Sequence, residues 1–152
     1  MKLALAMVAA LVLLIGATLV VLSLASRKAP TLGLVDGRLR VCPPTPNCVC
    51  SDHPAEASAV APLRFRGDPS SAWQRLKQAV VATGGEIDVE QDGYLHARYV
   101  TRWLRFVDDV EFRLDQAGGL IHVRSASRVG HSDFGANRRR LEAIRAAFGD
   151  RG

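Results

Sequence analysis

The sequence predicts an α+β domain, an antiparallel sheet of four to five strands with two helices, behind an apolar amino-terminal segment. Three patterns lead to this prediction: a long uncharged apolar run, two segments of helical periodicity, and a central stretch where apolar and polar residues alternate. Their order after the apolar run is strand, helix, four-stranded meander, helix. Such segregation of strands and helices is typical of the α+β class.

The first segment, Leu3 to Leu24, carries no charged residue and is long enough to cross a membrane. A helix that spans the bilayer core of about 30 Å needs roughly 20 residues. A cleaved secretory signal is the alternative, with Ser23-Leu24-Ala25 as its cleavage site, but the apolar part of such signals runs to only about 7 to 15 residues. We therefore predict that residues 1–28 form a transmembrane anchor or uncleaved signal.

Residues 29–62 are rich in Pro, Ala, Gly and Ser and lack sustained periodicity, which predicts a linker followed by an arm pinned by cysteines. In "CPPTPNCVCSDH", Cys42 and Cys48 flank a short proline-rich loop, a pattern that favours a disulfide in an oxidising compartment. The alternative is a zinc site that adds Cys50 and His53. Its spacing does not match the paired short spacings of structural zinc sites, so no metal is predicted.

The compartment is indicated by two opposing signals. Basic residues after the apolar run outnumber those before it, so the positive-inside rule would place the domain in the cytoplasm. The cysteine pattern favours the opposite side. We give the cysteines more weight and predict a single-pass protein of the bacterial inner membrane, with its domain facing the periplasm or cell exterior.

The charge of the domain is nearly balanced. The whole chain has a formal charge of +5, but residues 1–28 hold three of the basic groups, which leaves 17 basic against 15 acidic residues. This is not the electrostatic pattern of a nucleic-acid binder. The sequence also lacks a Gly-rich phosphate loop, so we predict neither nucleic acid nor a cofactor as partner, and it does not indicate an oligomeric state.

The α+β domain is predicted over residues 63–149. A short strand covers residues 63–67, and a helix covers residues 68–85, with Asp68 or Ser70 as its cap and an apolar face of Trp73, Leu76, Val80 and Val81. Strands follow at 86–90, 94–101, 104–115 and 119–129. The last helix begins near Ser132 or Asp133 and presents Phe134, Leu141, Ile144 and Phe148 to the sheet. The order allows a reduced helix-grip shape, by analogy of fold alone.

The last two strands can be given a register, because a slip of one residue would move every side chain to the opposite face. One face then carries Asp108 with Val110 and Phe112, opposite Ser125 and Ser127, and is covered by the last helix. The other face brings acidic side chains opposite basic ones. Its members are Asp109, Glu111, Arg113 and Asp115 on one strand, and His122, Arg124 and Arg128 on the next. We expect solvated ion pairs there, with an acid/base or metal site on Asp109 and Glu111 as the alternative.

A polar cluster is predicted between the sheet and the last helix, where Asn137 falls on the apolar stripe. Its groups either satisfy one another or line a small pocket beside the helix amino terminus, where backbone N–H groups favour an anion. Arg138, Arg139 and Arg140 need counter-charges, which we expect from the internal carboxylates of Asp108, Asp109 and Glu111. A phosphate, a carboxylate ligand or an anionic lipid head group is the alternative. The candidate site residues on both faces are Asp108, Asp109, Glu111, Arg124, Ser125, Ser127, Arg128, Asp133, Asn137 and Arg138.

Three ordered blocks, "CPPTPNCVC", "RFVDDVEFRLD" and "VRSASRVGHSDFGANRRRLEAIR", closely resemble the signature of the domain of unknown function 1499 family. The resemblance covers about residues 39–148. The family's first block usually reads Cys-Pro-x-x-Pro-Asn-Cys-Val-Ser-Ser, so Cys50 stands where serine is usual and His131 stands where an aromatic residue is common. The family has no established reaction, and the resemblance implies an uncharacterised envelope or organelle domain behind a hydrophobic segment.

Two functional hypotheses follow. The first is a membrane-tethered binding or scaffolding domain without catalysis, anchored through residues 3–24, which could hold a small anionic molecule or lipid head group. The second is a hydrolase-like enzyme that uses Asp108, Asp109 or Glu111 together with Arg124 or Arg128.

Overall fold

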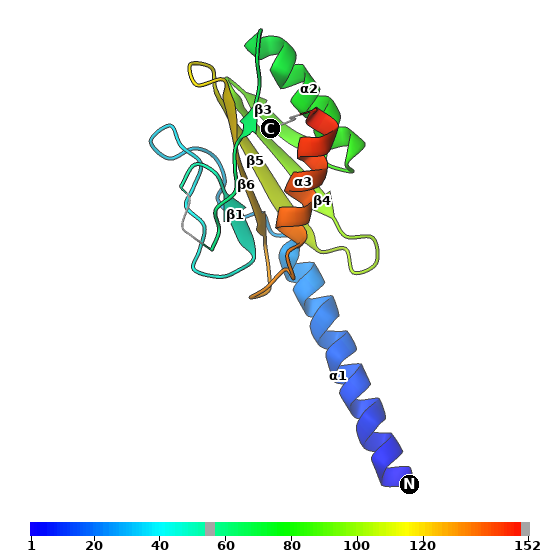
Figure 1. The fold of residues 1–152 in the computed structure, drawn as a ribbon. Helices are drawn as coiled ribbons and strands as arrows, with labels where there is room; N and C mark the ends of the chain where they lie inside the picture. Colours follow the sequence, from blue (N-terminus) through cyan, green and yellow to red (C-terminus); the bar gives the residue numbers. More distant parts are fainter. Residues whose placement is uncertain (54–56, 150–152) are drawn as a thin grey trace.

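The computed structural model describes residues 1–53 and 57–149, in which one long helix projects from an α+β domain (Figure 1). The described helices are α1 (Lys2–Ser26), α2 (Pro69–Ala82) and α3 (Ala136–Phe148). The described strands are β1 (Cys48–Cys50), β2 (Leu63–Arg64), β3 (Glu86–Gln91), β4 (Tyr94–Val100), β5 (Val107–Asp115) and β6 (Leu120–Ser127). The predicted class is confirmed, and the open antiparallel sheet has six strands, somewhat more than the four to five expected.

The additional strand, β1, lies in the predicted arm, residues 29–62. The sheet order is β1-β6-β5-β4-β3, and the short β2 also pairs with β6. Cys48 pairs with Ala126 and Cys50 with Arg124, so the disulfide-bonded segment forms part of the sheet. The arm's proline-rich composition gave no strand periodicity from which β1 could be predicted. Residues 54–56 of the arm lie outside the described residues.

The predicted register of the last hairpin is confirmed. Asp108 pairs with Ser127, Val110 with Ser125, and Phe112 with Val123, so each of these pairs shares one face of the sheet. We call this face the helix face, because α2 and α3 cover it (Figure 1). The cross-strand pairs place two serines and an aspartate beside the apolar core.

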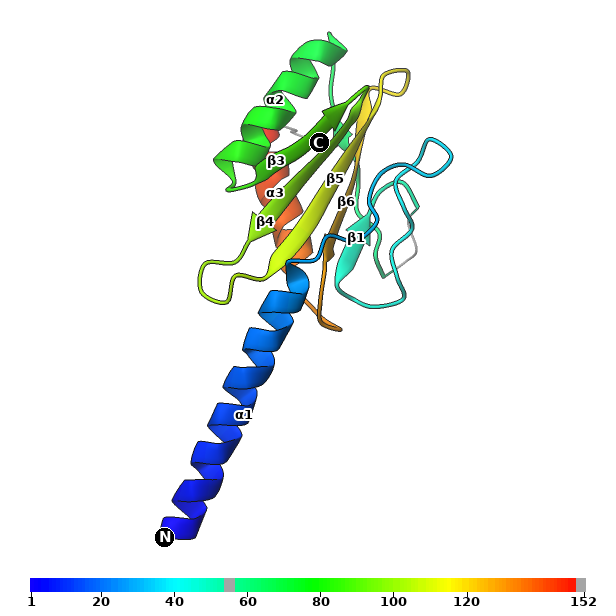
Figure 2. The same cartoon turned by 180° about the vertical axis from the view of Figure 1, so that it is seen from behind.

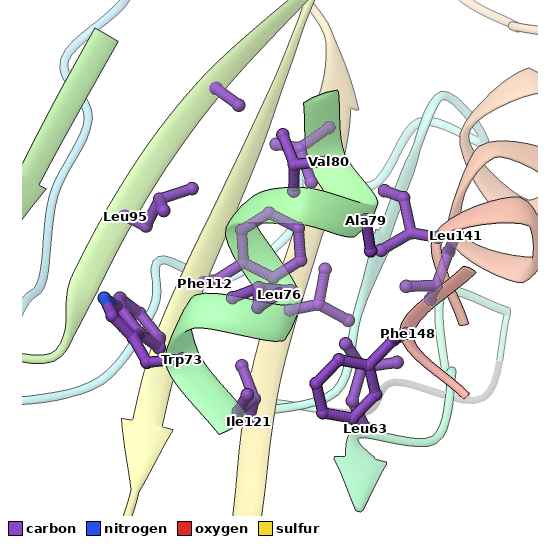
Figure 3. Close-up of a cluster of buried hydrophobic side chains, with 14 of the residues drawn as sticks. Leu63, Trp73, Leu76, Ala79, Val80, Leu95, Phe112, Ile121, Leu141 and Phe148 are labelled. Carbon is purple, nitrogen blue, oxygen red and sulfur yellow. The ribbon is translucent and has the colours of Figure 1, made fainter. Parts of the chain in front are cut away.

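The core lies between the helix face and the two helices (Figure 3). Phe112, Leu76 and Leu141 are fully buried there, together with Trp73 from the first turns of α2. Asp68 begins α2 as predicted, since its carboxylate accepts a hydrogen bond from the Ser71 N–H at 2.7 Å.

Two residues predicted on the apolar stripes are exposed instead. Val81 is turned to solvent, because the core-facing arc of α2 ends at Val80. Phe134 is 88 % exposed, because α3 begins only at Ala136 and Phe134 lies in the preceding loop with φ of +51°. The predicted start of the last helix near Ser132 or Asp133 was therefore early.

The chain that follows α1 crosses the opposite face of the sheet on its β5, β6 and β1 side, and we call this face the arm face (Figure 2). Asp109 and Glu111 lie on it and are only 2 % and 0 % exposed. The prediction of solvated ion pairs on this face was wrong, because residues between Arg27 and Asp52 contact these side chains and exclude water from them.

Helix α1 is apolar and long enough to cross a membrane, and its most apolar stretch makes no buried contact with the rest of the protein. Only its last turns dock on the domain. Ser23 and Ser26 are buried, and Ser26 Oγ accepts a hydrogen bond from the Val107 N–H at 3.2 Å. The start of β5 is thus fixed to the end of α1.

Candidate functional site

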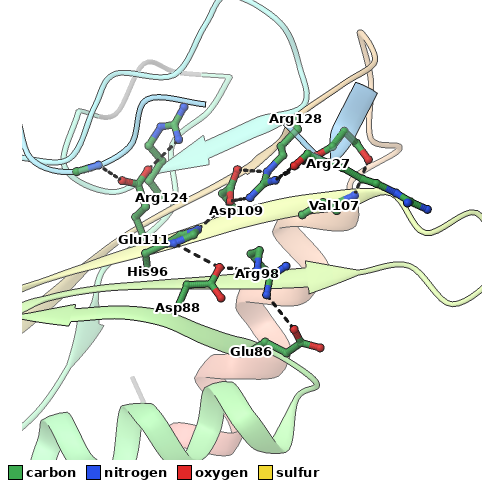
Figure 4. Close-up of polar contacts among 12 residues, drawn as sticks. Arg27, Glu86, Asp88, His96, Arg98, Val107, Asp109, Glu111, Arg124 and Arg128 are labelled. Carbon is green, nitrogen blue, oxygen red and sulfur yellow. Dashed lines mark hydrogen bonds and ion pairs between the residues drawn. The ribbon is translucent and has the colours of Figure 1, made fainter. Parts of the chain in front are cut away.

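Asp109 and Arg128 form the ion pair of the arm face nearest to α1 (Figure 4). Arg128 donates from Nε at 2.8 Å and from Nη2 at 2.7 Å, one bond to each carboxylate oxygen. Its Nη1 donates to the carbonyl oxygens of Ser26 at 3.2 Å and Arg27 at 3.3 Å, at the carboxyl end of α1. The guanidinium group thus bridges β5 and the anchor helix.

His96 is the second partner of Asp109, with its Nε2 atom 2.8 Å from the carboxylate. Burial alone would raise the pKa of Asp109, but the hydrogen bonds from Arg128 and His96 outweigh it and hold this pKa below its usual value. Asp109 is therefore an ionised, fully engaged carboxylate near neutral pH.

Glu111, two residues after Asp109 on β5, is also held by several hydrogen bonds. Arg124 donates to it at 3.0 Å, the Tyr94 hydroxyl at 2.8 Å and the Gly33 N–H at 2.9 Å. Burial and the Glu111 charge raise the pKa of Tyr94, so its phenol remains a proton donor to this carboxylate. The contact from Gly33 brings the beginning of the arm down onto the sheet.

Asp52 is the third buried carboxylate of the arm face, and sequence reasoning did not identify it. Arg113 binds it through two bonds of 2.8 and 2.7 Å, and the Leu39 N–H donates at 2.9 Å. Burial would raise the pKa of Asp52, yet the Arg113 and Leu39 hydrogen bonds and the nearby His122 and Arg113 charges hold it far below its usual range. Three buried ion pairs therefore run along this face.

The helix face carries a separate polar cluster around Asn137, which is fully buried. Its carbonyl oxygen accepts hydrogen bonds from Ser125 Oγ at 2.6 Å and from Arg140. Its amide nitrogen donates to Ser127 Oγ at 3.1 Å and to the Asn47 carbonyl at 3.0 Å. With two bonds at each end, the Asn137 amide has all its usual partners within the protein.

Among residues 1–53 and 57–149, Arg140 is the only one of the three consecutive arginines of α3 that has an acidic partner. It pairs with Asp108 and lies over the Tyr99 ring, 4.8 Å from its centroid. Arg138 and Arg139 instead donate to the backbone carbonyls of Ala59, at 3.1 Å, and Phe134, at 2.7 Å. The expectation that Asp109 and Glu111 neutralise these arginines was wrong, since both carboxylates face the other side of the sheet.

Asp133 holds the amino terminus of α3, although it precedes the helix by three residues. Its carboxylate accepts from the N–H groups of Asn137 at 2.7 Å and Gly135 at 2.9 Å. Burial alone would raise the pKa of Asp133, but these backbone hydrogen bonds outweigh it and hold this pKa below its usual value. The side chain caps α3 across a glycine at φ of +78°, a backbone conformation that other residues adopt less readily.

A pocket of about 340 Å³ lies where α1 meets the domain, and we call it the junction pocket. Its walls come from α1, the β4–β5 loop and the β6–α3 loop, and its polar lining includes two of the candidate carboxylates. The apolar lining residues are Leu19, Leu22, Phe106, Val129, Phe134 and Ala136. The main polar ones are Thr101, Asp108, Ser127, Ser132 and Asp133.

The candidate residues therefore fall into two groups on opposite faces of the sheet. Asp109, Glu111, Arg124 and Arg128 lie on the arm face, and the remaining candidates lie on the helix face or beside α3. Four residues that complete these groups were missed: Asn47, Asp52, Tyr94 and His96. Only Asn47 had a sequence signal, its place between Pro46 and Cys48 in the first signature block.

The cysteine prediction is confirmed, since Cys42 and Cys48 form a disulfide across a Cα–Cα distance of 5.7 Å. The bond removes both thiols from the alternative zinc set, and Cys50 is a buried free thiol. Within residues 1–53 and 57–149, no three His, Cys, Asp or Glu side chains are placed to hold a metal ion. The disulfide loop instead presents Asn47, whose carbonyl meets Asn137 and whose amide donates to the Gly130 carbonyl at 2.6 Å.

The contact between Asn47 and Asn137 joins the first and last of the blocks noted in the sequence. A family model described as "Protein of unknown function (DUF1499)" matches residues 38–148, which is most of the chain. The chain belongs to the DUF1499 family.

The matched range begins at Arg38 and ends at Phe148, so the DUF1499 region includes β1 and the disulfide as well as the helices of the domain. The apolar helix α1 precedes it. No curated protein matches the chain.

The Asn137 cluster predicts a structural cost for losing its amide. Replacing Asn137 by leucine keeps the volume but leaves the Ser125 hydroxyl without its acceptor and Ser127 Oγ without its donor, at roughly 1 to 3 kcal/mol each. We expect the free energy of unfolding, measured by chemical denaturation of the full chain in detergent, to fall by about 2 kcal/mol. Gln74→Leu, the same change on the exposed side of α2, should alter it by under about 0.5 kcal/mol. An Asn137→Leu protein as stable as the native one would contradict the structural role.

The Asp52 ion pair predicts a loss of stability in acid. A carboxylate whose pKa is lower in the folded state stabilises the protein above its unfolded pKa of about 3.9, and this contribution disappears as the pH falls toward the folded value. At pH 7, Asp52→Asn should lower the free energy of unfolding by roughly 3 kcal/mol. The difference from the native protein should shrink below about pH 4. A difference that stays constant from pH 7 to pH 3, as expected for the control Asp92→Asn in the exposed β3–β4 turn, would refute this account.

Proposed function

We propose that this DUF1499 protein is a membrane-tethered binding domain without catalytic activity, and that its ligand is a phospholipid whose acyl chain enters the junction pocket. The observation that carries the proposal is the position of the pocket. Two of its apolar walls, Leu19 and Leu22, belong to the helix that would cross the bilayer. A lipid could therefore reach the pocket without leaving the membrane.

The depth of the pocket supports an acyl chain as its occupant. Leu19 lies five residues before Leu24, the end of the apolar run, which corresponds to about 7.5 Å along a helix. The pocket thus extends from the head-group level toward the hydrocarbon layer. Its volume of about 340 Å³ is at the small end of the usual range for ligand sites, about 300 to 1,000 Å³.

A small anion is a poorer occupant of the same pocket. The N–H groups of Gly135 and Asn137, which could bind an anion beside α3, already donate to Asp133. The carboxylates of Asp133 and Asp108 also line the pocket, and a negative ligand would approach both of them. These contacts favour the lipid version of the binding hypothesis.

The ion pairs argue against the hydrolase hypothesis. Asp108 is separated by the sheet from Asp109 and Glu111, and each of the three is bound to a different arginine. A general acid or base needs a lone pair or proton directed at a substrate. Using one of these carboxylates would first require a buried pair to be broken, which costs about 3 to 5 kcal/mol.

We further propose a periplasmic or external location at the bacterial inner membrane. The Cys42–Cys48 disulfide suggests an oxidising compartment. The buried contacts of Ser23 and Ser26 with the domain support an anchor that is retained rather than cleaved beside Ala25. In this proposal residues 1–28 are the anchor, 29–62 the arm and 63–149 the α+β domain.

Native mass spectrometry of the full chain, released from lipid nanodiscs, tests the proposal. We expect one phospholipid to remain bound to the native protein. Val129→Trp should reduce the lipid-bound fraction several-fold, because the larger side chain fills the pocket. The control Val81→Trp, which adds the same side chain on the exposed face of α2, should retain the lipid. Equal retention by both variants, or no lipid on the native protein, would exclude this ligand site.

A further inference from the structure

The β4–β5 loop, residues Thr101 to Phe106, exposes a large aromatic side chain on the domain surface. Trp103 is 85 % exposed and Leu104 is also exposed. Arg102 and Arg105 flank them, and the six residues "TRWLRF" contain no acid. Two adjacent exposed apolar side chains rimmed by cations form a small patch of the kind that marks an interaction surface.

The loop is held in this conformation by its own backbone. The Thr101 N–H donates to the Phe106 carbonyl at 2.9 Å, and the Arg105 N–H donates to the Thr101 carbonyl at 3.2 Å. Thr101 Oγ1 accepts a third bond, from the Phe106 N–H, at 2.9 Å. The exposure of Trp103 is therefore a property of an ordered turn.

The position of the loop is fixed relative to the membrane helix. Val107, the residue after the loop, donates its N–H to Ser26 in the last turn of α1. The apolar run of α1 ends at Leu24, so Ser26 and the base of the loop lie at the level where the hydrocarbon layer ends. Figure 1 shows this loop and the β6–α3 loop at the end of the domain from which α1 leaves.

We propose that the β4–β5 loop docks in the phospholipid head-group layer of the membrane that α1 spans. The Trp103 indole then occupies the interface, where tryptophan is enriched in membrane proteins because one edge is apolar and the N–H is polar. Arg102 and Arg105 bind lipid phosphates, for which the guanidinium fork is suited. Phe134, exposed on the neighbouring loop, adds a second aromatic contact.

This docking goes beyond the proposed function, because it does not require a lipid inside the junction pocket. It gives the domain a defined height over the bilayer: α1 supplies the tether, and the loop supplies a second contact beside it. Trp103 also makes a cation–π contact with Arg102, whose guanidinium carbon lies 5.4 Å from the ring centroid. The ring and the cation can therefore enter the head-group layer as a unit.

Fluorescence quenching tests the docking directly, because the chain has only two tryptophans and the other one, Trp73, is buried in the core between α2 and the sheet. The full chain is reconstituted into vesicles whose lipids carry bromine either near the head group or deep in the acyl chain. We expect bromine near the head group to quench part of the emission, and that part to disappear in Trp103→Phe. Since Trp103 is exposed, this variant should fold normally and serve as the matched reference.

The arginines provide a second readout. In vesicles with anionic lipid, Arg102→Gln together with Arg105→Gln should reduce the quenching by shallow bromine at least two-fold, whereas Arg66→Gln, distant from α1, should not. The proposal is overturned if bromine near the head group quenches the native protein and Trp103→Phe equally, while iodide in the aqueous phase quenches Trp103 fully. That result would place the loop in water. Retained lipid in native mass spectrometry is a separate measurement, so the two proposals can fail independently.

Discussion

The guanidinium group of Arg128 joins the sheet to the anchor helix. It pairs with Asp109 on β5 and, through its remaining nitrogen, binds the last carbonyl oxygens of α1. Both interactions favour a cation, because Asp109 is ionised and the carboxyl end of a helix carries partial negative charge. With only 5 % of its side chain exposed, Arg128 must keep these partners, since an unpaired buried charge is strongly destabilising. These contacts fix the orientation of α1 relative to the domain. That orientation determines where the junction pocket and the β4–β5 loop lie relative to the membrane.

The other buried polar groups also join segments that are distant in the sequence. On the arm face, Glu111 of β5 accepts a hydrogen bond from Gly33 of the arm, and Asp52 of the arm pairs with Arg113 of β5, so both contacts hold the arm against the sheet. On the helix face, the Asn137 amide donates a hydrogen bond to the carbonyl oxygen of Asn47 in the disulfide loop. The strongly polar blocks shared with the DUF1499 family are thus contacts between segments distant in the sequence. Such contacts specify how the arm, the hairpin and α3 meet, while the apolar core supplies most of the burial.

The elements with clear periodicity could be predicted from the sequence, and the contacts that depend on the arm could not. Alternation in the last hairpin fixed which face carries Asp108 and Ser125, because a single slip would have exposed Phe112. The same alternation placed Asp109 and Glu111 together but could not show their burial, since charged residues at every second position are typical of a solvated face. Their burial depends on the path of the arm, and the arm has no hydrophobic periodicity from which that path could be predicted. Phe134 and Val81 were misplaced because a helical stripe does not define where a helix begins or how wide its buried face is.

The central claim, that Arg128 seats the domain rigidly on its anchor, is tested most directly by a distance distribution between α1 and the domain. Nitroxide labels carried by non-canonical amino acids at Val8 and Val81, both exposed, would report it by double electron–electron resonance in nanodiscs. The account predicts a single narrow distribution for the native protein, a markedly broader one for Arg128→Gln, and no change for Arg138→Gln on the outer side of α3. A native distribution as broad as that of Arg128→Gln would contradict it.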